Sequence, residues 1–233
     1  LGLTATPERA DGMSLGQLFD KIVIEKDIKF GIDNKYLCEL DAIRIKTGLS
    51  LDSVRTTAGE LNQKDLRLID IPERNNLIVQ KWKEYAIDRP TLPFCVDVQH
   101  AMNLNQAFLD QGIKSSFVVA DQQLCPNRKE RMAAFKAREI DVMINVSILT
   151  AGYDYANIGA IVNAAPTKSL RKFLQQVGRG TRLKEQWFVD KFGQKCLILD
   201  IVDSTTRHNL INTWTLDKVK LAKDKVFVSE EKR

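Results

Sequence analysis

One stretch organises the chain: it opens with Thr150-Ala151-Gly152-Tyr153-Asp154 and closes with Gln175-Gln176-Val177-Gly178-Arg179-Gly180-Thr181-Arg182. An apolar run, Val142-Met143-Ile144-Asn145-Val146, precedes the opening segment and predicts a strand buried in a parallel sheet. Folds that alternate strands and helices bind ligands where such a strand ends in a loop of small residues. The stretch therefore predicts an α/β fold with a ligand site just after this strand.

The closing segment places two arginines three residues apart among glycines. Residues three apart share one face of a helix, and a glycine turn would also bring both side chains together. Two planar guanidinium groups aimed at one place suit a phosphate, which arginine binds through paired hydrogen bonds. A surface ion pair is the alternative for Arg179 and Arg182, but the glycines and Gln175 favour the phosphate site.

Both segments resemble motifs of the superfamily-two helicases, in the branch that includes restriction-enzyme motor subunits and related DNA translocases. Motif V is matched by Thr150, Gly152 and Asp154. Motif VI is matched by Gln175, Gly178, Arg179 and Arg182. Many relatives carry glycine where this chain has Thr181, but threonine is common in the restriction-like branch.

Two further matches lie outside this stretch and keep the order of the family. Residues 1–7 resemble motif III and residues 91–96 resemble motif IV, so the resemblance covers most of the chain, from residue 1 to residue 203. In the family, motif III couples the state of ATP to nucleic acid, and Thr4 and Thr6 match it here.

The predicted elements alternate between strands and helices. Apolar runs predict strands at 94–98, 116–120, 141–146, 160–164 and 196–202, with a half-exposed strand at 41–46 and a strand-like run at 22–24. Helices are predicted at 14–21, 28–37, 73–86, 100–111 and 128–138, the last capped by Asn127, and Ser169 is expected to cap another that carries Gln175. This alternation predicts a parallel, doubly wound α/β sheet, and the resemblance implies a RecA-like version with helices on both faces.

The resemblance also implies a domain organisation. It makes residues 1–7 a remnant of a preceding RecA-like domain and residues 8–89 a connecting segment. Residues 90–203 are then the RecA-like helicase C-terminal domain, and residues 204–233 a C-terminal helix and tail. Neither a G-x-x-x-x-G-K-[ST] phosphate loop nor a DExx acidic box is present. Since these elements hold the phosphates and Mg²⁺, we expect them in an upstream RecA-like domain, and we expect this chain alone to be inactive.

The family resemblance assigns roles around ATP, which binds in the cleft between two RecA-like domains. It implies that Arg182 is an arginine finger on the γ-phosphate and that Arg179 is its partner. Gln175 could orient water or a phosphate, with an ordinary helix surface residue as the alternative. Candidate nucleotide contacts are Gly152, Gly178 and Asp154, of which Asp154 resembles a nucleotide-side or arginine-orienting acid.

Nucleic acid is the second partner that the resemblance implies, with DNA favoured by the subfamily and RNA left open. Thr150 is a candidate phosphate contact. Gln99 and His100 end the motif IV strand, where backbone phosphates pass in relatives. A basic cluster over residues 168–195 begins with Lys168, Arg171 and Lys172, although a solvated helix face would have a similar composition.

Composition sets broad limits on the kind of protein. The chain has 233 residues, which suggests one or two domains, and its hydrophobic content of 44% is ample for a core. A net charge of +5 is compatible with nucleic-acid binding without requiring it.

The cysteines and the apolar runs bear on location. None of the four cysteines forms a C-x-x-C pair, so a zinc site is not expected, and Cys95 and Cys196 lie in strand-like runs as core residues. We predict no metal site, no membrane segment and a cytoplasmic location, and the sequence leaves the oligomeric state open.

Two functions from different classes follow. The first is an enzyme: the second motor domain of an ATP-dependent DNA helicase or translocase. The second is a non-hydrolysing RecA-like module that binds nucleic acid or a partner protein. Intact Arg179 and Arg182 favour the first, because a module without ATP chemistry has no chemical use for them.

Overall fold

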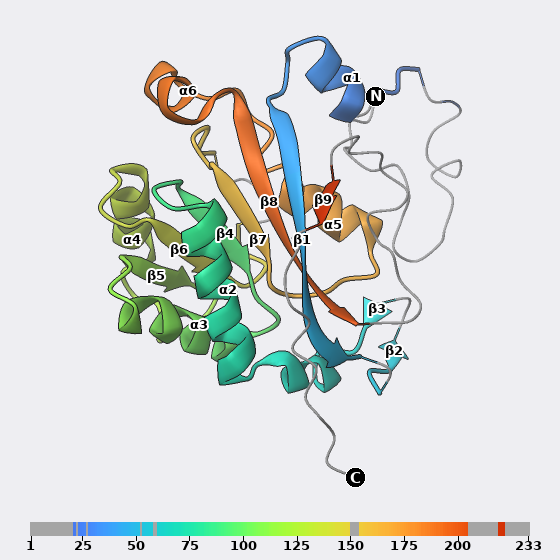
Figure 1. Cartoon of the computed structure of the whole chain (residues 1–233), viewed down its shortest axis with the longest axis vertical. Helices are drawn as coiled ribbons and strands as arrows, with labels where there is room; N and C mark the ends of the chain where they lie inside the picture. Colours follow the sequence, from blue (N-terminus) through green and yellow to red (C-terminus); the bar gives the residue numbers. More distant parts are fainter. Residues whose placement is uncertain are drawn as a thin grey trace.

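The computed structural model describes residues 21, 23–26, 28–51, 53–57, 60–149, 154–204 and 219–221. Within these residues seven strands form one sheet in the order β5-β6-β4-β7-β8-β1-β9, and every neighbouring pair is parallel (Figure 1). The strands are β1 (Glu39–Ser50), β4 (Thr91–Phe94), β5 (Ser115–Val118), β6 (Val142–Asn145), β7 (Ala160–Asn163), β8 (Lys195–Ser204) and β9 (Val219–Leu221). A separate antiparallel pair joins β2 (Thr56–Thr57) to β3 (Glu60–Leu61).

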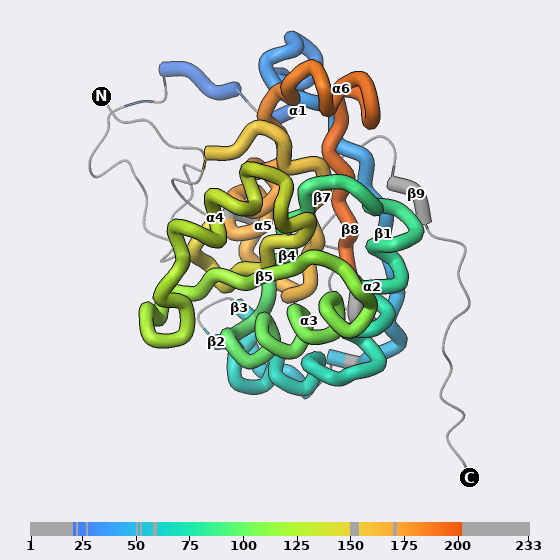
Figure 2. Tube along the Cα trace, turned by 90° about the vertical axis from the view of Figure 1, so that its left-hand side faces the viewer, coloured from blue at the N-terminus to red at the C-terminus, as the bar shows by residue number. Residues whose placement is uncertain are grey.

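Helices cover both faces of the sheet (Figure 2). They are α1 (Ile28–Asp33), α2 (Pro72–Tyr85), α3 (Val98–Asp110), α4 (Arg128–Lys136), α5 (Leu170–Val177) and α6 (Gln186–Phe192), with a 3-10 turn η2 (Asp65–Ile69) before α2. The α2 and α3 helices pack on one face, whereas α1, α4 and α5 pack on the other. The predicted fold class, an α/β sheet of doubly wound, RecA-like type, is therefore confirmed.

Large apolar side chains hold these layers together. Trp82 of α2 and Phe108 of α3 meet edge to face over one face of the sheet, and both are buried. The indole N–H of Trp82 donates to Thr91 Oγ1 at 2.7 Å, so the polar end of this ring is satisfied inside the core. On the other face, Phe135 of α4 and Phe173 of α5 are buried in the core. Burying one such side chain stabilises the fold by about 1.5–3 kcal/mol.

The β1 strand lies deeper than the sequence indicates. It was predicted as half-exposed, but it pairs with β8 on one side and β9 on the other. Ile43 and Ile45 face one core cluster, whereas Leu40 and Ala42 face the other, so both faces of its first half are covered. Both β1 and α2 lie in the segment assigned to a connection, and in the structure they form part of the sheet and of its cover.

Other elements differ locally from the predictions. Residues 23 and 24 form no regular structure where a strand-like run was expected at 22–24, and residues 219–221 form β9 where a C-terminal helix and tail were expected. Asn127 precedes α4 without a side-chain capping bond, but Ser169 caps α5 by accepting from the Lys172 backbone N–H at 3.2 Å. Thr4, Thr6 and all but the last residue of the helix predicted at 14–21 lie outside the described residues. No helix in the described part is long and apolar enough to cross a membrane.

The strand order creates a switch point between β4 and β7. The chain leaves β4 toward β5 on one side of the sheet and leaves β7 toward β8 on the other. Doubly wound folds bind ligands beyond the carboxyl ends of strands at such a point. From there, α5 runs back toward the amino ends of β7 and β8, so it joins two edges of the sheet.

Candidate functional site

A tight turn after α5 carries the two arginines. Gly178 N–H donates to Leu174 O at 2.8 Å and Gly180 N–H donates to Val177 O at 2.8 Å, so the backbone stays coiled beyond the helix. A Cβ atom on Gly180 would collide with Cys196 Sγ and would lie 3.2 Å from Ile161 Cγ1. The turn therefore packs directly on β7 and β8, and only glycine fits at position 180.

Arg182 joins this turn to the segment that follows β6. Its Nη1 lies 2.8 Å from Asp154 Oδ1, so residues matched to motif V and motif VI are in contact. The pair is open to solvent, since the two side chains are 37% and 78% exposed. An exposed ion pair contributes only about 0–1 kcal/mol to stability, so the pair adds little to the fold.

Arg179 lies in the same cluster of charges. Burial lowers the pKa of Arg179, the neighbouring Arg182 lowers it further, and Asp154 opposes both effects. The guanidinium nonetheless stays charged, because arginine does not lose its proton in proteins. Two guanidiniums thus lie near one exposed carboxylate, and such a cluster suits an anion with several oxygens. Gln175, one turn earlier on α5, is half-buried, and so is Gly178.

The residues predicted to contact nucleic acid do not all lie on the surface. Gln99 is exposed and bonds to Asn103, whereas His100 is fully buried and accepts from Val96 N–H at 3.3 Å through Nδ1. Burial, followed by the charge of Arg74, lowers the pKa of His100 to about 4, so the ring is neutral at pH 7. A neutral, buried imidazole offers a phosphate neither surface nor charge, and the structure contradicts that role for His100.

Lys168 and Lys172 lie at the start of α5, where they meet the β2–β3 pair. The Glu60 carboxylate accepts from Thr167 Oγ1, from Lys168 N–H at 2.7 Å and from Ser169 N–H at 3.3 Å. Burial raises the pKa of Glu60, but these hydrogen bonds and the charge of Lys172 outweigh it and leave the pKa below its usual value. The side chain of Arg171, along with Thr150 and Gly152, lies outside the described part.

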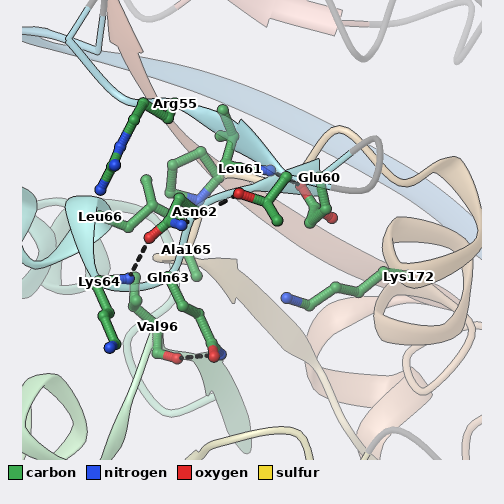
Figure 3. A pocket seen from close by; sticks show the side chains of 12 residues that line it. Arg55, Glu60, Leu61, Asn62, Gln63, Lys64, Leu66, Val96, Ala165 and Lys172 are labelled. Carbon is green, nitrogen blue, oxygen red and sulfur yellow. Dashed lines mark hydrogen bonds between the residues drawn. The ribbon is translucent and has the colours of Figure 1, made fainter.

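A pocket of about 620 Å³ opens beside this contact, at the carboxyl ends of β4 and β7 (Figure 3). Figure 3 shows Lys172 extending toward the pocket opposite Lys64 and Gln63, and Gln63 Nε2 donates to Val96 O at 3.1 Å. Sequence patterns gave no sign of this pocket, because the two-residue strands β2 and β3 have no measurable periodicity. The pocket occupies the switch point, where this fold class places ligands.

The basic cluster over residues 168–195 divides in the structure. Lys184 is only 6% exposed and belongs to the core, whereas Lys191 is exposed and lies 3.0 Å from Asp88. Among the described residues, no group of three or more His, Cys, Asp or Glu side chains could hold a metal ion. The four cysteines, all in the described part, are free and buried, which confirms the core positions predicted for Cys95 and Cys196.

Comparison with known proteins points to a family. The profile of the helicase conserved C-terminal domain matches residues 73–184, which include nearly all of α2, the strands β4 to β7 and both arginines. A Saccharomyces cerevisiae protein named as an ATP-dependent helicase, IRC3, is 33% identical over 210 residues, or 88% of this chain and 30% of that protein. Through this domain the chain is similar to the superfamily-two helicases. The match to the helicase C-terminal domain ends at Lys184, just after the arginine turn.

Further relatives agree with this placement. A Schizosaccharomyces pombe protein named as a mitochondrial ATP-dependent helicase, irc3, is 33% identical over 90% of this chain and 34% of its own length. The Escherichia coli EcoAI endonuclease subunit, of a type I restriction enzyme, is 25% identical over 80% of this chain and 26% of its own length. This chain thus spans about a third or less of the length of these curated relatives.

Solved structures support the fold. A fragment from Vibrio vulnificus described as an HsdR subunit of a type I restriction enzyme superposes with a TM-score of 0.64 at 21% identity, over 84% of this chain and 38% of that chain. The C-terminal domain of the DEAD-box protein Dbp5 superposes with a TM-score of 0.54 at 14% identity, over 79% of this chain and 88% of that chain. The helicase C-terminal domain here therefore has the same fold as a DEAD-box C-terminal domain.

Proposed function

We propose that this chain is the second motor domain of an ATP-dependent DNA helicase or translocase. In this proposal an upstream RecA-like domain binds ATP, and the arginine turn faces the γ-phosphate across the interdomain cleft. The observation that carries the proposal is the convergence of Arg179, Arg182 and Asp154, which come from two segments and lie together at the surface. The relatives named as ATP-dependent helicases support the same activity.

The residues of the turn fit the terminal phosphate of ATP. ATP supplies the phosphoryl group, and negative charge spreads over its oxygens as the bond to the leaving group breaks. Arg182 acts as the finger, because a fixed guanidinium stabilises this charge without reorganising. Arg179 adds a second cation, Gly178 and Gly152 let the backbone come close, and Gln175 orients water or phosphate. Mg²⁺ is assigned to the upstream domain, since its carboxylate ligands have no counterpart in the arginine turn.

Asp154 has a separate task in this mechanism. Its carboxylate accepts from Arg182 and keeps the guanidinium in one place until the phosphate arrives. Because the pair is open to solvent, a phosphate with more charge than one carboxylate can reach the guanidinium and bind it in place of Asp154.

Nucleic acid is proposed to bind along the carboxyl edge of the sheet. Gln99, Lys168 and Lys172 lie there with their side chains wholly or partly accessible, and Thr150 and Arg171 are assigned to the same surface. His100 is withdrawn from this group because it is buried. DNA is the proposed substrate because one relative is a subunit of a restriction endonuclease. We also propose a reducing, cytoplasmic location, which the free, buried cysteines support.

The test compares the 233-residue chain with the complete polypeptide that carries the upstream domain. We expect the complete polypeptide to hydrolyse ATP faster when DNA is added, and the chain alone to show no turnover with or without DNA. Turnover by the chain alone would contradict the proposed division of labour. A complete polypeptide that binds DNA normally but never hydrolyses ATP would instead indicate a non-hydrolysing module.

A further inference from the structure

The Lys184 side chain reaches into the protein beneath the arginine turn. Its Nζ donates to Gly180 O at 2.8 Å, to Ile158 O at 2.7 Å and to Ala156 O at 2.9 Å. An ammonium group has three donors, and here each donor has one backbone carbonyl as its acceptor. The side chain is only 6% exposed, so water competes little for these bonds.

The three acceptors belong to the two segments that form the arginine site. Gly180 lies between Arg179 and Arg182, whereas Ala156 and Ile158 follow Asp154 by two and four residues. One ammonium group therefore ties the backbone that carries the guanidiniums to the backbone that carries their carboxylate.

Neighbouring contacts make this junction stiff. Glu185 N–H donates to Asn157 Oδ1 at 2.9 Å, which ties the same two segments a second time. Cys38 Sγ donates to Gly180 O at 3.1 Å and Cys38 N–H donates to Thr181 O at 2.8 Å, so the start of β1 supports the turn from below. Burial raises the pKa of the Cys38 thiol, which keeps it protonated as a donor.

A buried lysine is a costly way to join two loops. Moving an ammonium out of water is unfavourable, and here its three hydrogen bonds go to carbonyl dipoles and not to a carboxylate. An apolar side chain could fill the same volume at less cost to stability. What a lysine adds is a fixed separation between two backbone segments, and the groups that depend on this separation are Asp154 and Arg182.

We propose that Lys184 is a positioning residue for the arginine finger. This inference rests on the proposed function, because Lys184 affects catalysis only by fixing the position of Arg182 relative to Asp154 and the γ-phosphate. Lys184 does not itself touch the nucleotide. An error of about 1 Å in the position of a catalytic group can cost about 10²-fold in rate, so a loosened junction should affect catalysis more than binding.

The experiment is a double-mutant cycle in the complete polypeptide, with DNA present and below the melting temperature of every variant. Lys184→Met keeps the length of the side chain and removes the ammonium group. We expect it to lower the ATPase kcat by about 10–100-fold while the KM for ATP changes less than about threefold. In an Arg182→Ala background, the same change should lower kcat by less than about threefold, because there is no finger left to misplace.

The melting temperature separates positioning from plain stability. Lys184→Met should lower it by the same amount in both backgrounds, because the hydrogen bonds that are lost do not involve the Arg182 side chain. Lys191→Met is the matched control, since Lys191 is an exposed lysine on α6 that lies 3.0 Å from Asp88, and it should leave kcat unchanged. If Lys184→Met does not fold, Lys184→Gln keeps a shorter neutral donor. It should lower kcat strongly when Arg182 is present and only weakly in the Arg182→Ala background.

The outcomes distinguish this inference from the proposed function. If Arg182→Ala retains near-normal kcat, the finger assignment fails and the proposed function fails with it. If Arg182→Ala lowers kcat but folded Lys184→Met or Lys184→Gln keeps wild-type kcat, Lys184 is a structural residue only. Equal losses of kcat from the lysine change in both backgrounds would also contradict positioning, because the effect would then not pass through Arg182.

Discussion

At the scale of the residue, the arginine site contributes little stability but carries a large share of the proposed function. The Arg182–Asp154 pair is exposed, and such pairs contribute about 0–1 kcal/mol to folding. A fixed cation at a breaking phosphoryl bond can contribute several kcal/mol to the transition state. Replacing Arg182 should therefore change the melting temperature very little and the ATPase kcat strongly.

Asp154→Asn tests this difference in the complete polypeptide. The amide keeps the shape of the side chain but loses its charge, so we expect a change in melting temperature of less than about 2 °C. The ATPase kcat should fall about 10-fold, because Arg182 is no longer held in one orientation. The control is Asp88→Asn, which breaks a comparable exposed pair with Lys191 and should leave kcat intact. Equal kinetic effects of the two changes would contradict a specific role for Asp154.

His100 gives a pH prediction at the same scale. Its folded pKa of about 4 lies below the unfolded value of about 6.5, so the unfolded chain binds more protons between these values. The stability that His100 contributes is complete above pH 6.5 and is lost as the pH falls toward 4. Between pH 7 and pH 5 we expect a loss of about 2 kcal/mol from this residue.

The measurement is urea denaturation at both pH values, for the wild type and for His100→Gln. The variant should be less stable at pH 7 and should show a smaller loss between pH 7 and pH 5. Parallel losses in the two proteins would mean that groups other than His100 cause the acid sensitivity.

At the scale of the element, α5 is held at both ends by specific contacts. Its start is capped by Ser169 and by the Glu60 carboxylate from β3, and its end runs into the glycine turn. The helix has eight residues, so its ends lie about 12 Å apart at 1.5 Å per residue. Its start belongs to the pocket edge and its end to the arginine site, so α5 gives the two sites a short, rigid connection.

Glu60→Gln is the prediction for this element. The change removes a negative charge from the start of α5 but keeps an oxygen acceptor, and we expect a loss of stability of about 1 kcal/mol, since the group is half-exposed. DNA affinity at low salt should rise severalfold, because Lys168 and Lys172 lose a competing anion. Fluorescence titration with labelled single strands at two salt concentrations measures this effect.

The control for Glu60→Gln is Glu84→Gln, which removes a carboxylate beside Lys81 on α2. This change also removes one negative charge, but away from α5, so DNA affinity should rise much less. If both variants gain affinity equally, the gain reflects overall charge and the account of the α5 start is wrong.

Sequence patterns predicted elements better than the placement of single side chains. The strands β6 and β7 were found within about one residue at each end, because a strand buried on both faces is a nearly continuous apolar run. The strand predicted at 94–98 was placed too late, since β4 spans Thr91–Phe94. The short elements β2, β3 and α6 were missed, since two to seven residues are too few to show a period. The depth of β1 was underestimated because its partners β8 and β9 come far later in the chain.

The site shows the same limit. Asp154 was predicted as a nucleotide-side or arginine-orienting acid, and although it lies 2.8 Å from Arg182, its role stays a prediction. His100 was misplaced because nothing in its neighbourhood shows that its ring turns into the core. Lys184 was counted with surface lysines, because a lysine is almost never fully buried unless its charge is compensated. Burial of a polar side chain depends on tertiary packing, which local sequence does not encode.

At the scale of the whole molecule, the two proposed sites occupy different edges of one sheet. The arginine turn packs at the amino ends of β7 and β8, whereas the pocket opens at the carboxyl ends of β4 and β7. Figure 1 shows β2 and β3 at the end of the sheet opposite α1 and α6. Contacts to the nucleotide and to nucleic acid can therefore be disturbed separately, and a change at one edge should leave direct binding at the other edge intact.

The central claim is that Arg182 stabilises charge in the transition state of ATP hydrolysis. The most direct measurement is steady-state ATPase of the complete polypeptide with Arg182→Ala, together with nucleotide binding, DNA binding and a melting curve. We predict that kcat falls by about 10³-fold or more while both affinities change much less and the fold persists. Arg182→Lys should restore only part of the rate, because an ammonium lacks the planar fork. A near-normal kcat for Arg182→Ala would contradict the claim and would leave Arg182 as a surface partner of Asp154.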